Sequence, residues 1–176
     1  KKKIKNNNKI SENLIINNYL SKLNFNKPGT YNFKNDGAYI KLKNNKKIVV
    51  TTDSILEDID FFLGDNPKSI AHKVLSINLS DLSAMGAYPY AYTLNLFLPK
   101  YIDQLWLKIF CNELLKFQKK YNFYLLGGDL SSSKKLAITA TFLGTSKKNK
   151  VIGQNVINVD DDIWVTGNIG DSYLGL

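Results

Sequence analysis

Four aspartates are the residues of this chain best placed to do chemistry together. Asp36 lies in NDGAY, Asp53 ends VVTTD, Asp129 ends LLGGD, and Asp81 lies in NLSD, so each belongs to a predicted strand, turn or helix. One aspartate in such a place is usually a turn former or a helix cap. Four in one chain favour a shared site if the fold brings them together.

Asp81 is the most informative of the four, because the segment around it, residues 75–89, is strongly apolar. Burying an unpaired carboxylate costs several kcal/mol, so we expect a cation beside it. If the four aspartates converge, a divalent metal has to offset their repulsion, and hard oxygen ligands select magnesium or calcium. Thr51 and Thr52 would add oxygens beside Asp53.

Magnesium held by a few carboxylates usually shares its shell with waters and phosphates, which indicates a nucleotide. Glycines in LLGGD (residues 125–129) and VTGNIGD (residues 165–171) would let the backbone approach such a ligand closely. Neither stretch is a Walker loop, a Rossmann fingerprint or a protein-kinase loop. These residues therefore predict a phosphate-handling enzyme outside those folds.

Composition excludes several other classes of protein. The hydrophobic content of 44% is ordinary for a globular chain, and no apolar run approaches the roughly 20 residues of a membrane span. The lysine-rich start has no signal-peptide core, so we expect a cytoplasmic protein without a membrane partner. The net charge of +9 comes from lysines spread over loops and termini, without the aromatic interleaving of a stacking platform, and we expect no nucleic-acid partner.

The single cysteine and the single histidine are assigned no chemical role. Cys111 has no second cysteine and no metal-ligand spacing around it, and we expect a small core or boundary residue. His72 lies in an amphipathic segment and is expected at the surface or at the boundary of the core.

The elements that position the aspartates follow from hydrophobic patterning. Strands are predicted at residues 36–42 and 46–53, joined as a hairpin by residues 43–46, and at residues 90–99, 122–130 and 135–146. Helices are predicted at residues 11–23, 68–84 and 101–121, the second beginning near Pro67 and ending at Gly86 and Pro89. Residues 24–33 are predicted as a loop with a Pro-Gly turn, 122–130 as a strand ending in a glycine turn, and 161–176 as a strand, a glycine turn and the start of a helix. The predicted fold class is α/β (α+β), a mixed β-sheet with helices packed on it.

Five stretches taken in order resemble the N-terminal half of the thiamine-monophosphate kinase family, which belongs to the superfamily of aminoimidazole ribonucleotide synthetase and selenophosphate synthetase. They are NDGAYI, VVTTDSILEDIDF, AHKVLSINLSDLSAMGAYP, LLGGDLS and DDIWVTGNIGDSYLGL. The match runs from about residue 33 to the end of the chain. Its most specific part is NLSDLSAMGA followed at this separation by GGD.

The resemblance implies transfer of the γ-phosphoryl group of ATP to thiamine phosphate, giving thiamine diphosphate, with several magnesium ions. It also implies a homodimer through this domain, with nucleotide along the domain boundary. The metal-binding positions of the family fall on Asp36, Thr51, Thr52, Asp53, Asp81 and Asp129. Its ATP-binding positions fall on Gly128 and Asp129, and its substrate contact falls on Asp60.

The resemblance implies no catalytic side chain, since the attacking phosphate oxygen is already deprotonated and metal-assisted direct transfer can rest on positioning and charge. Composition, patterning and the resemblance together predict three parts of the chain. Residues 1–10 are expected to be a basic disordered tail, 11–160 the N-terminal domain that binds ATP and magnesium and dimerises, and 161–176 the truncated start of a C-terminal domain.

Four positions depart from the family pattern. Lys34 and Asn35 replace the first glycine and the first aspartate of Gly-Asp-Asp, Asp60 replaces a histidine, and Gln154 replaces an arginine that would touch ATP. A degenerate paralogue is one interpretation of these changes. Because the four main aspartates are kept, we expect an active kinase when the whole chain is present.

Two other functions stay open at the level of the sequence. One keeps the scaffold in another ATP-dependent synthetase of the superfamily, although the reactive cysteine expected of selenophosphate synthetases is missing here. The other is a non-catalytic basic interaction module whose aspartates are caps and turns. Magnesium-dependent nucleotide binding would separate the kinase from the module.

Overall fold

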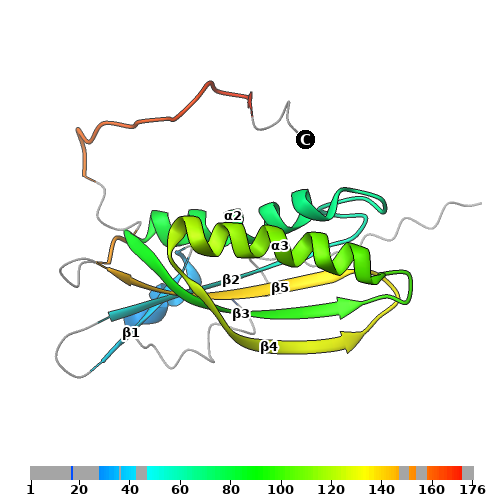
Figure 1. Cartoon of the computed structure of the whole chain (residues 1–176). Helices are drawn as coiled ribbons and strands as arrows, with labels where there is room; N and C mark the ends of the chain where they lie inside the picture. Colours follow the sequence, from blue (N-terminus) through cyan, green and yellow to red (C-terminus); the bar gives the residue numbers. More distant parts are fainter. Residues whose placement is uncertain are drawn as a thin grey trace, which may run out of the picture.

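The computed structural model describes Asn17 and residues 28–35, 37–42, 47–146, 151–153 and 158–171. Its centre is one five-stranded sheet with the strand order β1-β2-β5-β3-β4, and two long helices cover one face of it (Figure 1). The strands are β1 (Ala38–Lys41), β2 (Lys47–Leu56), β3 (Ala87–Leu98), β4 (Tyr124–Ser132) and β5 (Ala137–Ser146). The predicted fold class is confirmed.

The sheet is mixed in direction. β1 pairs with β2, β2 with β5, and β5 with β3, all antiparallel, so the predicted hairpin of the first two strands is confirmed. β3 and β4 run parallel. A parallel pair needs a crossover, which the helix α3 (Gln104–Tyr121) supplies.

Local signals fix both ends of the helix α2 (Pro67–Ala84). The side chain of Asn66 accepts a hydrogen bond from the backbone N–H of Lys68, and Pro67 occupies the first turn, as the sequence predicts. The helix ends before Gly86, whose φ of +65° suits glycine. Pro89 does not end the helix, because it lies inside β3.

The core lies between the two helices and the covered face of the sheet. Along β2 the odd-numbered side chains, including Val49 and Ile55, point to this face, because successive side chains of a strand alternate. Tyr92 of β3 and Phe142 of β5 stack there with their ring centroids 4.9 Å apart. Each fully buried side chain of this size contributes about 1.5–3 kcal/mol, which holds α2 against the sheet.

Some predicted elements differ from the observed ones. Residues 28–33 form the 3-10 helix η3 (Pro28–Phe33) where a loop is predicted. β4 runs on through Gly127 and Gly128 to Ser132 instead of ending in a glycine turn, since a bulge absorbs the glycines inside the strand. Residues 158–171 contain no strand, because no neighbouring strand lies beside them to complete the hydrogen bonds.

The predicted places of the single cysteine and the single histidine can also be compared with the structure. Cys111 is exposed on α3 and is therefore not a core or boundary residue. His72 is exposed on α2, as predicted, with its ring edge against Phe117. The predicted tail at residues 1–10 and the turn at 43–46 lie outside the described residues, as does the helix at 11–23 apart from Asn17.

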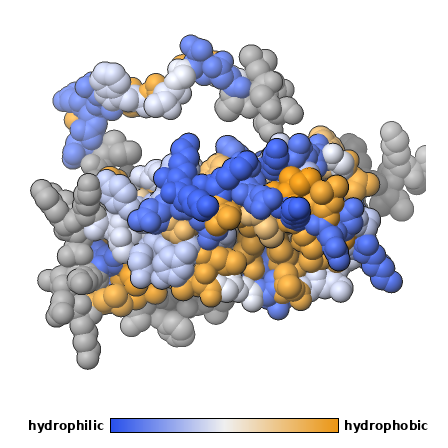
Figure 2. All heavy atoms as spheres, viewed as in Figure 1, coloured by the Kyte–Doolittle hydropathy of each residue, from blue (hydrophilic) through white to orange (hydrophobic). Residues whose placement is uncertain are grey.

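The sheet edge at β4 is exposed and rich in large apolar side chains. Figure 2 shows hydrophobic residues gathered below the helices, in the region of β3 and β4. The exposed apolar residues of β4 are Tyr124, Leu125, Leu126 and Leu130. Neither helix of the described part of the chain is long and apolar enough to span a bilayer.

Candidate functional site

Two of the predicted site residues meet where β2 packs against α2. Thr51 is 4% exposed, and its hydroxyl donates to Oδ2 of Asp81, with Oγ1 and Oδ2 2.7 Å apart. α2 runs back along β2 from the loop after Leu56, which brings Asp81 near the helix end beside the middle of the strand. The hydrogen bond fixes the carboxylate at the boundary between helix and sheet.

Asp53 lies on the same face of β2 as Thr51, two residues further along, and is half-buried. Thr52 points to the opposite face. There its hydroxyl lies 3.2 Å from the carbonyl oxygen of Ala140, to which it donates, and 2.9 Å from Oγ1 of Thr141. The structure therefore brings Thr51, Asp53 and the helix together, and it places Thr52 across the sheet from them.

Asp129 lies on the edge strand β4 within a small polar network. Its backbone N–H donates to Oδ1 of Asn95 at 3.1 Å, and its Oδ2 accepts from the hydroxyl of Ser131 at 2.7 Å. Patterning did not single out Asn95 or Ser131. Ser131 could have been found, because it follows Asp129 by two positions on a strand and so shares its face.

Strand register shows on which face Asp129 lies. Asp129 is in register with Asn95, Asn95 with Thr139, and Thr139 with Ser54. Residues in register share a face, and Ser54 lies on the face of β2 opposite to Asp53. Asp129 therefore lies across the sheet from Asp53, on the face that α2 and α3 leave uncovered (Figure 1).

Gly128 has a steric reason to be glycine. A Cβ added there would lie 1.8 Å from the carbonyl oxygen of Leu94 on β3, whereas one added at Gly127 would meet nothing within 4 Å. Gly128 thus lets β4 approach β3 closely, which positions Asp129 beside Asn95. This packing role exists whether or not a nucleotide contacts the same glycine.

Asp60 closes the turn that follows β2. Its Oδ2 accepts from the backbone N–H of Leu56 at 2.8 Å, and its carbonyl oxygen accepts from the ammonium group of Lys73 on α2. The side chain is half-buried, and it lines a cavity together with Phe61 and Ser69. Asp60 therefore holds the loop in place and also borders a space open to a small ligand.

The remaining predicted positions do not join this group within the described part of the chain. Asp36 and Gln154 lie outside the described residues, and Lys34 is exposed. Among the described residues, no three of histidine, cysteine, aspartate and glutamate stand close enough to hold one metal ion. The three described aspartates, Asp53, Asp81 and Asp129, therefore do not form the shared cluster expected from the sequence. What is described is one group at the contact of β2 with α2 and a separate group on β4.

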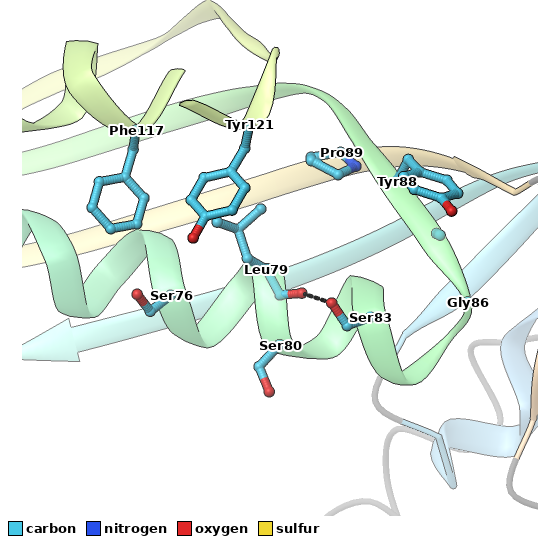
Figure 3. Close-up of a pocket in the computed structure, with 10 residues that line it drawn as sticks. Ser76, Leu79, Ser80, Ser83, Gly86, Tyr88, Pro89, Phe117 and Tyr121 are labelled. Atoms are coloured by element: carbon cyan, nitrogen blue, oxygen red, sulfur yellow. Dashed lines mark hydrogen bonds between the residues drawn. The ribbon is translucent and has the colours of Figure 1, made fainter. Parts of the chain in front are cut away.

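A cavity of about 550 Å³ lies beside α2, α3 and the start of β3 (Figure 3). None of the predicted site residues lines it. In Figure 3 the hydroxyl of Ser83 donates to the carbonyl oxygen of Leu79 at 2.8 Å. The residues along its wall are neutral and include Ser76, Ser80, Ser83, Tyr88, Phe117 and Tyr121. This cavity offers hydroxyl groups but no charged group for phosphate or metal.

Residues 34–146 match the family described as AIR synthase related protein, N-terminal domain. This chain belongs to that family. The AIR synthase related domain covers all five strands and both long helices. The predicted resemblance to the aminoimidazole ribonucleotide synthetase superfamily is therefore confirmed for the fold.

Thiamine-monophosphate kinases are among the proteins similar to this chain. The chain is 40% identical over 142 residues to that of Buchnera aphidicola subsp. Schizaphis graminum, which covers 80% of this chain and 43% of the relative. The thiamine-monophosphate kinase structure from Stenotrophomonas maltophilia K279a is 31% identical, with a TM-score of 0.68 over 80% of this chain and 44% of that one. The structure of AaThiL complexed with AMPPCP and TMP is 26% identical, with a TM-score of 0.79 over 89% of this chain and 48% of that one.

These comparisons confirm the resemblance that the sequence stretches predict. They also show that the chain spans less than half the length of the curated relatives it matches.

Proposed function

We propose that this chain is the N-terminal domain of a thiamine-monophosphate kinase, which transfers the γ-phosphoryl group of ATP to thiamine phosphate. The observation that carries the proposal is the 40% identity over 142 residues to a curated thiamine-monophosphate kinase. The neighbouring structure of AaThiL holds AMPPCP, an ATP analogue, and TMP, which supports the same pair of substrates. The cytoplasmic location expected from the sequence belongs to this proposal.

The group at the contact of β2 with α2 fits magnesium by its donor chemistry. The hydroxyl of Thr51 and the carboxylate of Asp81 are hard oxygen donors 2.7 Å apart, and Asp53 lies on the same face of the strand. One or two carboxylates are enough for magnesium, which takes its other ligands from water and phosphates. Bound there, magnesium would neutralise charge on the triphosphate.

The chain's own residues have positioning roles in this proposal. Thr51 holds Asp81 in one orientation, and no side chain has to remove a proton from the attacking phosphate oxygen. Asp129, steadied by Asn95 and Ser131, would hold a further metal ion from the other face of the sheet.

Three assignments are part of the proposal and rest on the resemblance. Gly128 is placed at the nucleotide and Asp60 at thiamine phosphate, which is supported by the cavity that Asp60 lines. Asp36 is assigned to the metal, although it lies outside the described residues. Residues of the protein beyond this chain would complete the site.

We also infer that two copies of the domain pair through the uncovered face of the sheet. Hydroxyl groups stand in register across this face. Oγ of Ser54 lies 2.7 Å from Oγ1 of Thr139, and Thr52 stands beside Thr141. A second copy would cover a face that neither α2 nor α3 reaches (Figure 1), and it would bring a second Asp129 to the same side of the sheet.

Calorimetric titration with ATP, with and without magnesium, tests the proposed function. We expect ATP to bind only with magnesium and Asp81→Asn to weaken binding at least about tenfold, since the amide keeps the hydrogen bond from Thr51 but loses the charge. Asp58→Asn, which removes an exposed charge elsewhere, should leave binding unchanged. ATP binding that ignores magnesium would exclude the proposal.

Turnover needs the complete gene product. With magnesium-ATP and thiamine phosphate it should form thiamine diphosphate, while residues 1–176 alone should show weak or no turnover. A complete protein that forms no thiamine diphosphate, with or without Asp81→Ala, would contradict the assignment of the substrate.

A further inference from the structure

A short segment after β5, residues 151–153, packs against the end of α2. The backbone N–H of Ile152 donates to the carbonyl oxygen of Met85 at 3.1 Å. Carbonyl groups at the end of a helix have no partner within the helix, so this bond satisfies one of them from a distant part of the chain. The side chain of Ile152 lies over Gly86, because a Cβ added at Gly86 would be 2.9 Å from Cδ1 of Ile152. The segment therefore closes the end of the helix.

Residues 151–153 also contact the stretch just before Asp36. A Cβ added at Gly153 would lie 3.1 Å from Nδ2 of Asn35 and 3.1 Å from Cε1 of Tyr31. Such short distances mean that the backbone of Gly153 packs directly on these two side chains. The segment thus lies between the end of α2 and the residues that lead to a predicted metal ligand.

Met85 completes this contact from the side of the helix. It is 2% exposed, and a Cβ added at Gly37 would lie 3.4 Å from Cγ of Met85. Asn35 and Gly37 are the two neighbours of Asp36 in the sequence. One neighbour therefore packs on residues 151–153, and the other packs on the end of α2.

The same end of the helix carries Asp81. The backbone N–H of Met85 donates to the carbonyl oxygen of Asp81 at 3.0 Å, while the carboxylate of Asp81 accepts from Thr51. A displacement of Met85 would therefore be passed to Asp81 through the last turn of the helix. Groups that hold a metal ligand in place from behind affect metal affinity although they do not touch the ion.

A purely structural role for Ile152 would be to cap the helix and stabilise the fold. Its side chain is 53% exposed, so it adds little to the core. Its contacts instead join the two stretches that contain Asp36 and Asp81. Ile152 also lies beyond residues 34–146, which match the family, so the resemblance assigns it no role.

We propose that Ile152 is a positioning residue for the magnesium site. By holding the end of α2, it fixes Asp81 relative to the stretch that contains Asp36. This inference rests on the proposed function, which assigns both aspartates to the metal.

Hydrogen exchange of the complete gene product without metal gives the first reading. Ile152→Ala removes the side chain that lies over Gly86, and it should speed exchange of the Met85 amide at least about threefold. The amide of Leu75, in the middle of α2, should exchange at the native rate. Ile152→Val keeps the branched side chain and should restore the native rate at Met85. Leu105→Ala, which removes an equally exposed aliphatic side chain on α3, is the matched control and should change neither amide.

Calorimetric titration of the same proteins with ATP and magnesium gives the second reading. Ile152→Ala should weaken ATP binding at least about threefold, while Ile152→Val and Leu105→Ala should bind as the native protein does. Native ATP binding by Ile152→Ala overturns the proposal, because the segment would then only cap the helix, and so does an unchanged exchange rate at Met85. Both results leave the proposed function standing. A native protein that binds no ATP with magnesium excludes the proposed function and this inference with it.

Discussion

The hydrogen bond between Thr51 and Asp81 ties the candidate site to the fold. It joins residues 30 positions apart and places a carboxylate at the packed boundary of helix and sheet. A hydrogen bond to a charged partner contributes about 1.5–3 kcal/mol, and more is lost when a buried partner stays unpaired. The same hydrogen bond therefore positions the Asp81 carboxylate and stabilises the folded chain.

Thr51→Val tests this contribution, because valine keeps the shape of threonine but cannot donate to Asp81. We expect a loss of about 1–3 kcal/mol in the free energy of unfolding, measured with urea. Thr52→Val is the matched control, since Thr52 is exposed on the other face of the same strand, and it should cost less than about 0.5 kcal/mol. Equal losses in both variants would show that the Asp81 contact has no special weight.

Tyr101 makes a pH-dependent contribution at the other end of β2. Burial and the hydrogen bond to the Glu57 carboxylate raise the pKa of Tyr101 from 10.0 to about 12. The folded state then holds the phenolic proton more tightly than the unfolded state, so this stabilisation is complete below pH 10 and is lost as pH rises toward 12. Tyr101→Phe should show a shallower fall of unfolding free energy across this window, measured by urea unfolding at several pH values. An unchanged slope would mean that Tyr101 does not hold its proton this way.

Among the elements, the edge strand β4 owes its register to the glycine pair Gly127 and Gly128. Register shifts beside them, between Tyr92 and Thr93 of β3, so the strand takes up one extra residue and continues. This bulge decides which β4 side chains share the uncovered face with Asp129. A glycine turn at the same place would have ended the strand at the aspartate.

Gly128→Ala should disturb β4 more than Gly127→Ala, because both substitutions strain the backbone at positive φ but only the one at Gly128 also meets β3. The added methyl group at Gly128 would collide with backbone of Leu94, which cannot move aside as a side chain can, while the two glycines have nearly equal φ, +156° and +157°. We expect Gly128→Ala to cost about 1–3 kcal/mol more than Gly127→Ala. Thermal unfolding measures the difference, and hydrogen exchange should show the loss concentrated in β3 and β4. Two variants of equal stability would exclude the steric explanation.

Residues 158–171 include a stretch with the apolar pattern of a strand, but no neighbouring strand pairs with it among the described elements. Ile163 is 94% exposed, Trp164 88% and Ile169 93%. Apolar side chains so exposed favour burial against another surface. The match covers only 43% of the curated relative, so under the proposed function residues outside this chain would supply that surface.

In the molecule as a whole, the two long helices of the described part of the chain cover only one side of the sheet. The two helices bury the apolar face, and the other face presents threonine, serine and the Asp129 group (Figure 1). Antiparallel sheets can leave one face to solvent, but this face also carries a predicted metal ligand. Pairing of two copies through this face would bring its hydroxyl groups and the Asp129 group into one interface.

Thr52→Lys tests the pairing, because it places a charge on the uncovered face of both copies. We expect the native chain to sediment as a dimer and Thr52→Lys to shift it to monomer by at least about tenfold in the dissociation constant. Leu115→Lys adds the same charge on the exposed side of α3 and should leave the dimer intact. A native chain that stays monomeric at high concentration would refute pairing through this face.

The sequence determined most of the fold. Asn66 and Pro67 mark a helix start by local hydrogen bonding, the alternation along residues 46–53 marks a half-buried strand, and both signals need only near neighbours. The family can also be predicted from local sequence, because NLSDLSAMGA and GGD are short sequence motifs. Neighbouring residues alone fixed these features.

Which site residues meet depends on the packing of distant segments. Thr51 reaches Asp81 because α2 folds back on β2, and Asp129 lies on the opposite face because the bulge in β4 sets its register with Asn95. The strand predicted at the start of residues 161–176 is missing among the described elements, since strand hydrogen bonds need a partner that local sequence does not contain. The face of a side chain depends on pairing between distant segments, and pairing is a property of the folded chain.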